Sequence, residues 1–204
     1  MKFVRCALAA AAATLALGSA HASLVTLTDG GVFQSGFANA AAVQSAALAA
    51  TVGESSATIS QFNNVVAAGL GQVFTINFGL SAAQAGAWDF RFGVDFGGGG
   101  AVFVDGVAMA FNNSDMWWAG DWNASAEVFN VSTVLAAGNH TISVYGFEQC
   151  CFGGNSGQYN NGQGWVTFGS QDGLAAAVPE PGSVAMMLAG LGALGLTGRR
   201  RRKA

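Results

Sequence analysis

The chain has 204 residues, of which 51% are hydrophobic and only 9% are charged, and its formal net charge is -3. Seven of its eight basic residues lie within the first five or the last six positions, which leaves Arg91 as the only one in between. A chain of this length can bury a core of its own, but a middle part with one cation and ten acids, a net of -9, is unsuited to nucleic acid or anionic lipid. Free carboxylates in such a part could bind hard cations such as calcium.

Residues 1–22 have the three regions of a secretory signal. Lys2 and Arg5 precede an apolar stretch, and Ala20-His21-Ala22 gives the small-x-small pattern that signal peptidase cuts. The sequence therefore predicts a signal helix over residues 1–22 that is removed on export. The mature protein is then expected to begin near Ser23.

The C-terminal residues 178–204 combine a motif, an apolar run and a basic end. The motif is Val178, Pro179, Glu180 and Pro181, and the run from Ser183 to Gly198 follows it. The sixteen residues of that run reach about 24 Å as a helix, which makes a short transmembrane anchor. The basic end consists of Arg199, Arg200, Arg201, Arg202 and Lys203. It is expected to stay cytoplasmic.

This tail resembles the PEP-CTERM sorting signal of Gram-negative bacteria. The resemblance implies an exosortase that cuts near the motif, so that the mature protein lacks residues 183–204. It also implies a precursor anchored in the inner membrane, and a product in the periplasm, on the outer surface or in the extracellular matrix with exopolysaccharide. The alternative is an ordinary single-pass anchor.

The ectodomain, residues 23–177, is rich in Gly, Asn, Ser, Val and Phe, and its apolar residues mostly recur with period two, as in half-buried strands. The sequence predicts an all-β, antiparallel sandwich of jelly-roll type. Its expected strands are 57–66, 72–78, 87–96, 101–104, 107–111, 126–131, 141–147 and 164–168, with Asp105-Gly106 as a tight hairpin turn. The alanine-rich stretch 34–51 is expected to form a short helix, a small-residue loop or a strand pair.

The centre of the ectodomain resembles the anthrax protective antigen type of β-sandwich. The similarity lies in residues 85–92, in Asp95 with the glycines after it, in residues 102–106, and in a Gly-x-His strand over 135–145. It implies carbohydrate binding and, in some members, a calcium ion on two adjacent aspartates. Here Phe96 follows Asp95, so Asp95 alone remains as a metal candidate, and no other cofactor is expected.

Three of the five tryptophans lie within six residues, next to two acids. These candidate glycan-binding residues are Asp115, Trp117, Trp118, Asp121 and Trp122. Aromatic faces cover the apolar C–H surfaces of sugars while carboxylates accept hydrogen bonds from hydroxyls. The alternative is that the tryptophans belong to the core, where such side chains usually lie.

Cys150 and Cys151 are the only cysteines after the signal. In an oxidising compartment we expect them to form a vicinal disulfide that stiffens a turn, although pairing with another chain or two reduced thiols remain alternatives. The run from Tyr145 to Gly153 also resembles a Cys-Cys-x-Gly signature of some PEP-CTERM proteins, which implies no mechanism.

Two classes of function remain. The first is a non-catalytic envelope or matrix protein that binds exopolysaccharide. The second is a secreted glycan hydrolase that uses paired carboxylates, with Asp115, Asp121, Glu127 and Glu148 as the acids that could converge. His140, at the start of an expected strand, is interpreted as structural, and the ectodomain carries no phosphate loop, nucleophile elbow or HExxH motif.

Overall fold

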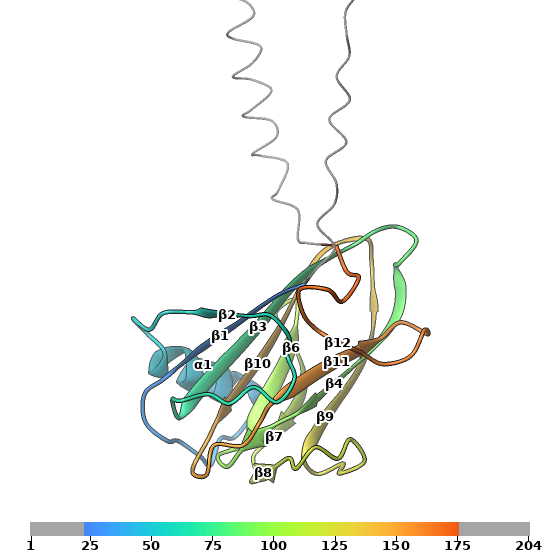
Figure 1. Ribbon diagram of the computed structural model, residues 1–204. Helices are drawn as coiled ribbons and strands as arrows, with labels where there is room; N and C mark the ends of the chain where they lie inside the picture. Colours follow the sequence, from blue (N-terminus) through green and yellow to red (C-terminus); the bar gives the residue numbers. More distant parts are fainter. Residues whose placement is uncertain (1–22, 176–204) are drawn as a thin grey trace, which may run out of the picture.

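The computed structural model describes residues 23–175 (Figure 1). The expected signal helix and the sorting tail with its short anchor lie outside the described residues. Within residues 23–175 no helix has the length and apolar character needed to cross a membrane.

The described part is an antiparallel β-sandwich, as predicted. One sheet has six strands in the order β2-β1-β3-β10-β6-β7, and the other has four in the order β12-β11-β4-β9. The six strands are β2 (Ala57–Ile59), β1 (Leu24–Gly30), β3 (Gly71–Leu80), β10 (Gly138–Phe147), β6 (Gly100–Val104) and β7 (Val107–Asn112). The four strands are β12 (Val166–Thr167), β11 (Ser156–Asn160), β4 (Gly86–Gly93) and β9 (Val128–Leu135).

The inner faces of the two sheets enclose an aromatic core. Along β4, Trp88, Phe90 and Phe92 are buried, while Asp89 and Arg91 point away from the core, as the period of two requires. They meet side chains from β3 of the other sheet. Phe78, for example, lies 6.4 Å from Phe90 and 6.3 Å from Trp88, measured between ring centroids. Because each such ring buries a large apolar area, this layer contributes strongly to the stability of the fold.

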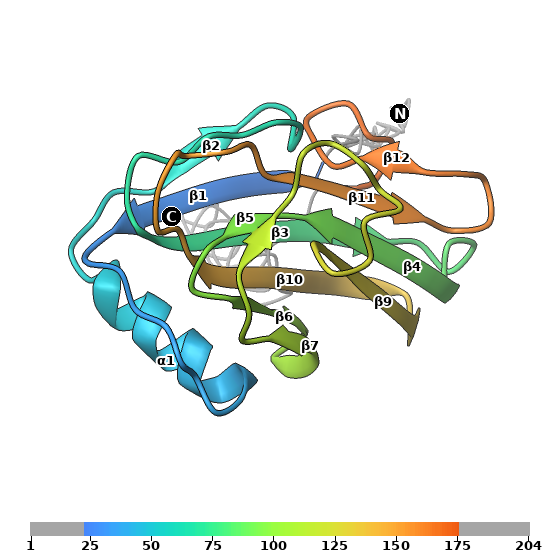
Figure 2. The ribbon, with the colours of Figure 1, turned by 90° about the horizontal axis from the view of Figure 1, so that it is seen from below.

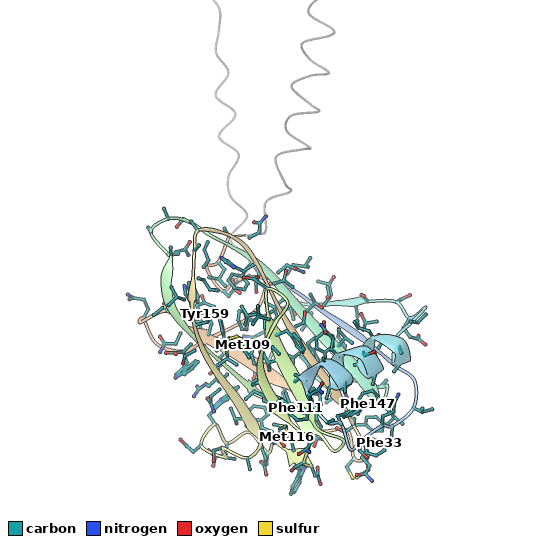
Figure 3. The ribbon with its side chains drawn as sticks, turned by 180° about the vertical axis from the view of Figure 1, so that it is seen from behind. Phe33, Met109, Phe111, Met116, Phe147 and Tyr159 are labelled. Carbon is teal, nitrogen blue, oxygen red and sulfur yellow. The ribbon has the colours of Figure 1, made fainter. Side chains whose placement is uncertain are left out.

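The six-stranded sheet is buried on its outer face as well. The helix α1 (Ala40–Ala50) lies across β10, β3 and β6, and a second apolar cluster fills the space beneath it. Figure 3 shows Phe147, a member of this cluster, and Phe33, which packs against it, on the side that α1 covers. Burial on both faces explains why β6 is an unbroken apolar run.

Helix α1 begins at the point where a side chain can cap it. Asn39 has an extended backbone and its side-chain oxygen accepts a hydrogen bond from the Ala42 N–H at 3.0 Å. The helix ends at Thr51, whose hydroxyl donates to the Ala47 carbonyl oxygen at 3.0 Å. Of the alternatives for residues 34–51, the short helix is therefore the one that forms.

Several strand boundaries differ from the predictions. The expected strand 57–66 stops at Ile59, because Phe62 turns into the core and donates its N–H to the Phe168 carbonyl. The strand expected at 126–131 begins only at Val128, because the Glu127 N–H bonds to the Ala124 carbonyl in a turn. The strand expected at 164–168 is reduced to two residues, since Gly164 has φ +101° in the preceding loop.

Three strands were not predicted: β1, β11 and the two-residue strand β8 (Met116–Trp117). The strand β1 begins two residues after the expected signal. The strand β11 has the sequence Ser-Gly-Gln-Tyr-Asn, whose small and polar residues give no sign of a strand. The Asp105-Gly106 turn is confirmed, with φ of 50° and 79° at the two positions, as a two-residue hairpin between β6 and β7 requires.

A third, two-stranded sheet closes one end of the sandwich. It pairs β5 (Asp95–Phe96) with β8 (Met116–Trp117), and Figure 2, seen from that end, shows both strands in front of the two main sheets. The described chain begins and ends at the opposite end (Figure 1). The two ends of the sandwich are therefore distinct, one with β5 and β8 and one with the chain ends.

Candidate functional site

A pocket of about 230 Å³ opens at the end of the sandwich closed by β5 and β8. It is lined by residues from β5, from β8 with the residue before it, and from the segment after β10. These residues are Asp95, Gly97, Asp115, Trp117, Glu148, Gln149, Cys150 and Cys151, and together they are called the Trp117 pocket below.

Two predicted glycan-binding residues, Asp115 and Trp117, lie in this pocket. Strand β8 holds them in place by pairing Met116 with Phe96 and Trp117 with Asp95. Met116 is buried beneath the strand, so its neighbour Trp117 must point the other way, and 66% of Trp117 is exposed. Asp115 is also exposed. The pocket therefore offers solvent one broad aromatic face and one free carboxylate.

Two buried carboxyl groups, Asp95 and Glu148, form the inner wall of the pocket. They are 4% and 2% exposed. Burial, with the adjacent Asp95 charge as the second cause, raises the pKa of Glu148 to about 7, and burial also raises the pKa of Asp95. Near neutral pH the pair therefore carries a proton for part of the time, which avoids two buried negative charges side by side.

The same two carboxyl groups hold both ends of the cysteine-containing turn. Oε1 of Glu148 accepts hydrogen bonds from the N–H groups of Gln149 and Cys150, each at 3.0 Å. Oδ2 of Asp95 accepts one from the Gly153 N–H. Oε2 of Glu148 is buried and makes no hydrogen bond in the described structure. The carboxyl pair thus fixes the rim of the pocket through backbone contacts.

The turn between these anchors is strained. Cys151 and Phe152 have φ of 73° and 42°, values that side-chain-bearing residues rarely adopt. The Cys150 and Cys151 sulfur atoms are those of two free thiols and lie 2.7 Å apart, whereas a disulfide needs about 2.0 Å. The hydrogen bond between the Cys150 and Cys151 thiols, together with burial, raises the pKa of Cys150 to about 11. The vicinal disulfide therefore stays a prediction.

The oxygen atoms around Asp95 are not suited to bind a calcium ion. Its Oδ2 is taken by the Gly153 N–H, its other neighbour is a carboxyl group that carries a proton part of the time, and Phe96 is buried in the core. Among residues 23–175 no three acidic, histidine or cysteine side chains are grouped as metal ligands would be. Calcium needs six to eight oxygen ligands, so we assign it no role.

The other predicted glycan-binding residues lie away from the pocket. Trp118 is only 7% exposed, and its indole N–H donates to the backbone carbonyl of Asp121 at 3.1 Å. Its ring fills the space above Gly93, where a Cβ atom would approach it to 2.2 Å. The carboxylate of Asp121 accepts hydrogen bonds from Asn123 and so closes a local turn.

Trp122 belongs to a stack on the outer face of the four-stranded sheet. The Arg91 guanidinium lies between two rings, 4.3 Å from the centroid of Trp122 and 4.1 Å from that of Trp165. Its Nε also donates to Gln158 at 2.9 Å. The only arginine of the ectodomain is therefore fixed by two cation–π contacts and a side-chain amide.

The remaining residues considered for catalysis do not converge on the pocket. Glu127 follows the Asp121 loop and does not line the Trp117 pocket. His140 is buried, with Nδ1 2.7 Å from the Asp105 carboxylate and Nε2 2.9 Å from the Ala136 carbonyl, so it closes the β6–β7 hairpin onto β10. The sequence prediction missed Asp95 and Gln149 as pocket residues. The β5–β8 pairing brings Asp95 beside Trp117, and Gln149, which follows β10, lies against Gly97.

The fold is that of PA14 domains, the anthrax protective antigen type that the sequence resembles. The PA14 sugar-binding domain from RTX adhesin matches with a TM-score of 0.54 and 14% identity, over 77% of this chain and 99% of that domain. The A domain of epithelial adhesin 9 from Candida glabrata, solved in complex with Galβ1-4GlcNAc, matches with a TM-score of 0.50 and 8% identity, over 79% and 91%. Identities this low show the fold alone.

The C-terminal tail matches a known sorting motif. Residues 177–202 match the PEP-CTERM protein-sorting motif, which confirms the resemblance drawn from Pro179-Glu180-Pro181 and the basic end. No curated protein matches the sequence. The chain thus carries a PA14-type sandwich followed by a PEP-CTERM sorting motif, the mark of an exported protein.

Proposed function

We propose that this chain is an exported, non-catalytic protein of the bacterial envelope or extracellular matrix that binds a glycan in the Trp117 pocket. The observation that carries the proposal is the exposed face of Trp117 beside the free carboxylate of Asp115 at the mouth of a concave site. An aromatic face covers the C–H side of a sugar ring, and a carboxylate accepts hydrogen bonds from its hydroxyls.

The size of the pocket suits a small part of a glycan. Its volume of about 230 Å³ lies below the roughly 300–1,000 Å³ of drug-sized sites, so one sugar ring is the natural occupant. The Gln149 side chain, exposed on the rim, can both donate and accept hydrogen bonds. A terminal or branching residue of a polysaccharide would satisfy these contacts better than a long extended segment.

The fold adds independent support. The RTX adhesin domain is described as sugar-binding, and the epithelial adhesin domain was solved with a bound disaccharide. Strand β8, which carries Trp117, also lies at the end of the sandwich opposite to the end of the described chain (Figure 1). The sorting motif follows from residue 177. In a precursor anchored through its tail, this arrangement would turn the pocket away from the membrane.

A hydrolase is the second candidate, because a carboxyl group with a pKa of about 7 beside a second acid is typical of a general acid. The contacts of Glu148 favour a non-catalytic glycan-binding site over a hydrolase. Its Oε1 already accepts two backbone N–H groups and its Oε2 has no solvent-accessible surface. A general acid must reach the leaving-group oxygen, and neither atom can do so without opening the turn.

The proposal includes processing of the tail by an exosortase, which would leave beyond the inner membrane an acidic domain with a net charge of -9 over residues 23–177. The intact mass of the envelope-associated protein tests this step. We expect a mass that lacks residues 183–204. A mass that still includes the arginines at 199–202 would contradict processing and leave the tail as a permanent anchor.

The binding proposal is tested by presenting the exported protein to an array of bacterial polysaccharides and measuring new reducing ends in the same samples. We expect retention on at least one polysaccharide without release of reducing ends. Turnover that is abolished by Glu148→Gln or by Asp115→Asn would favour the hydrolase. If the protein shows no retention on any polysaccharide and no turnover, both candidate functions are ruled out.

A further inference from the structure

The side chain of Asp172 is a buried carboxylate at the end of the sandwich where the described chain begins and ends. It is 8% exposed and lies against Ser23, which is 4% exposed. Oδ1 accepts hydrogen bonds from the Ser23 N–H at 3.1 Å and from the Leu174 N–H at 3.0 Å. Oδ2 accepts from the Ser23 hydroxyl and from the Gly169 N–H at 3.1 Å.

In the described structure the Asp172 carboxylate accepts hydrogen bonds but contacts no positively charged group. Within residues 23–175 the only contact between a basic and an acidic side chain joins His140 and Asp105. Tyr159 is the other ionisable group nearby, and its hydroxyl donates to the backbone carbonyl of Asp172, not to the carboxylate. A buried carboxylate is stabilised further when a positive charge joins its hydrogen bonds. A positive charge on the Ser23 nitrogen would lie 3.1 Å from Oδ1 of Asp172.

The expected removal of the signal creates a cation at this nitrogen. Hydrolysis of the Ala22–Ser23 bond adds water, leaves a carboxylate on Ala22 and gives Ser23 an amine, which takes up a proton near neutral pH. The nitrogen that now makes one neutral hydrogen bond to Asp172 would then carry a positive charge and two further hydrogens.

We propose that Asp172 is the binding site for the α-ammonium group of Ser23, formed when the signal is removed. The ion pair fastens the start of β1 to the last described segment before the sorting motif. It also makes the position of cleavage matter, because a mature chain one residue longer or shorter would place its charge about 3.8 Å away along the backbone. The position of signal cleavage during export would therefore affect the stability of the mature protein. The inference rests on the export step of the proposed function and not on the glycan pocket.

The test compares four exported chains made from the full-length precursor: the natural sequence, Asp172→Asn, a Gly-Thr insertion between Ala22 and Ser23, and both changes together. The insertion leaves Ala20-His21-Ala22 intact, so that cleavage yields a chain with two extra residues and a displaced amine. The mass of the N-terminal peptide first establishes where each mature chain begins.

Melting temperatures then measure the coupling between the amine and the carboxylate. We expect Asp172→Asn to lower the melting temperature of the natural chain by roughly 4–8 °C, and to lower that of the chain with the insertion by clearly less. Equal losses in the two chains would overturn the proposal, because Asp172 would then serve only the neutral N–H groups of Gly169 and Leu174. A natural chain that begins elsewhere than at Ser23 would overturn it as well.

A second measurement does not depend on whether Asp172→Asn folds. Residues 23–175 contain no lysine, so the α-amine is the only amine of the ectodomain. Buried against Asp172, it should be acylated at least tenfold more slowly than the amine of the chain with the insertion, as read from the N-terminal peptide. Equal rates would contradict the ion pair.

Discussion

Trp117 and Trp118 are adjacent in the sequence but lie on opposite sides of their segment, one 66% exposed over the pocket and the other 7% exposed above Gly93. The two neighbours therefore serve different purposes. One is available to a ligand, and the other closes the end of the sandwich.

This difference predicts opposite effects of the same substitution. Trp118→Ala should lower the free energy of unfolding by about 3–5 kcal/mol, because it leaves a cavity and frees the Asp121 carbonyl. Trp117→Ala should change it by less than about 1 kcal/mol, as is usual for exposed side chains. Urea unfolding followed by circular dichroism measures both. Equal losses would mean that Trp117 is a core residue and unavailable for binding.

The Asp95–Glu148 pair predicts a pH-dependent stability. The pKa of Glu148 is raised from a usual value of about 4.5 to about 7, so between these values the folded protein holds a proton that the unfolded chain releases. The group therefore lowers stability progressively as pH rises from about 4.5 through about 7, and the penalty is complete above that. Below about pH 4.5 it is absent.

Glu148→Gln should remove this penalty, because the amide oxygen can still accept from Gln149 and Cys150 while carrying no charge. We expect the variant to melt at a higher temperature than the natural protein at pH 8 and at a similar temperature near pH 4.5. Glu54→Gln, the matched change at an exposed glutamate, serves as the control. A variant that is less stable at pH 8 would show that the ionised carboxylate stabilises the turn.

The cysteine pair gives a prediction for each redox state. If the vicinal disulfide forms, the exported monomer should resist alkylation without reductant and weigh two hydrogen atoms less than the dithiol. In the reduced protein, a Cys150 pKa of about 11 leaves little thiolate, so its alkylation at pH 8 should be slower than that of an ordinary thiol. Two alkylated cysteines in unreduced monomer would defeat the disulfide, and a disulfide-linked dimer would support pairing between chains.

The Arg91 stack predicts that lysine cannot replace arginine there. Lysine has no planar group to lie between Trp122 and Trp165 and cannot keep the geometry toward Gln158. Arg91→Lys should therefore lower the free energy of unfolding by roughly 1–2 kcal/mol, at about 0.5–1 kcal/mol for each exposed cation–π contact. Chemical unfolding measures this, and an unchanged midpoint would show that the stack contributes nothing.

Much of the fold could be predicted from local pattern. The alternation of Trp88, Phe90 and Phe92 with Asp89 and Arg91 indicated a strand with one buried face, and that strand is β4. Asp105-Gly106 indicated a two-residue hairpin, since few other pairs adopt two positive φ values easily. These features depend on neighbours in sequence, which a reader of the sequence can see.

The missed strands and the composition of the site depend on distant partners. Strand β11 is extended because β4 pairs with it, from Ser156 opposite Gly93 to Asn160 opposite Asp89, and its own residues have little preference for that form. The tryptophan cluster divides because Met116 and Trp118 are drawn into the core, which leaves Trp117 outside. Asp95 and Glu148 meet only once the sheets have packed. These contacts join residues that are far apart in the sequence, so no local sequence pattern indicates them.

The most direct test of the account is a calorimetric titration of the exported protein with a polysaccharide fragment that it retains, repeated with Trp117→Ala and Trp165→Ala. Both variants remove an exposed tryptophan, but only Trp117 lines the pocket. We predict that Trp117→Ala weakens binding at least tenfold and that Trp165→Ala leaves it unchanged. Binding that survives Trp117→Ala, or that is lost with Trp165→Ala alone, would contradict the assignment of the Trp117 pocket as the glycan site.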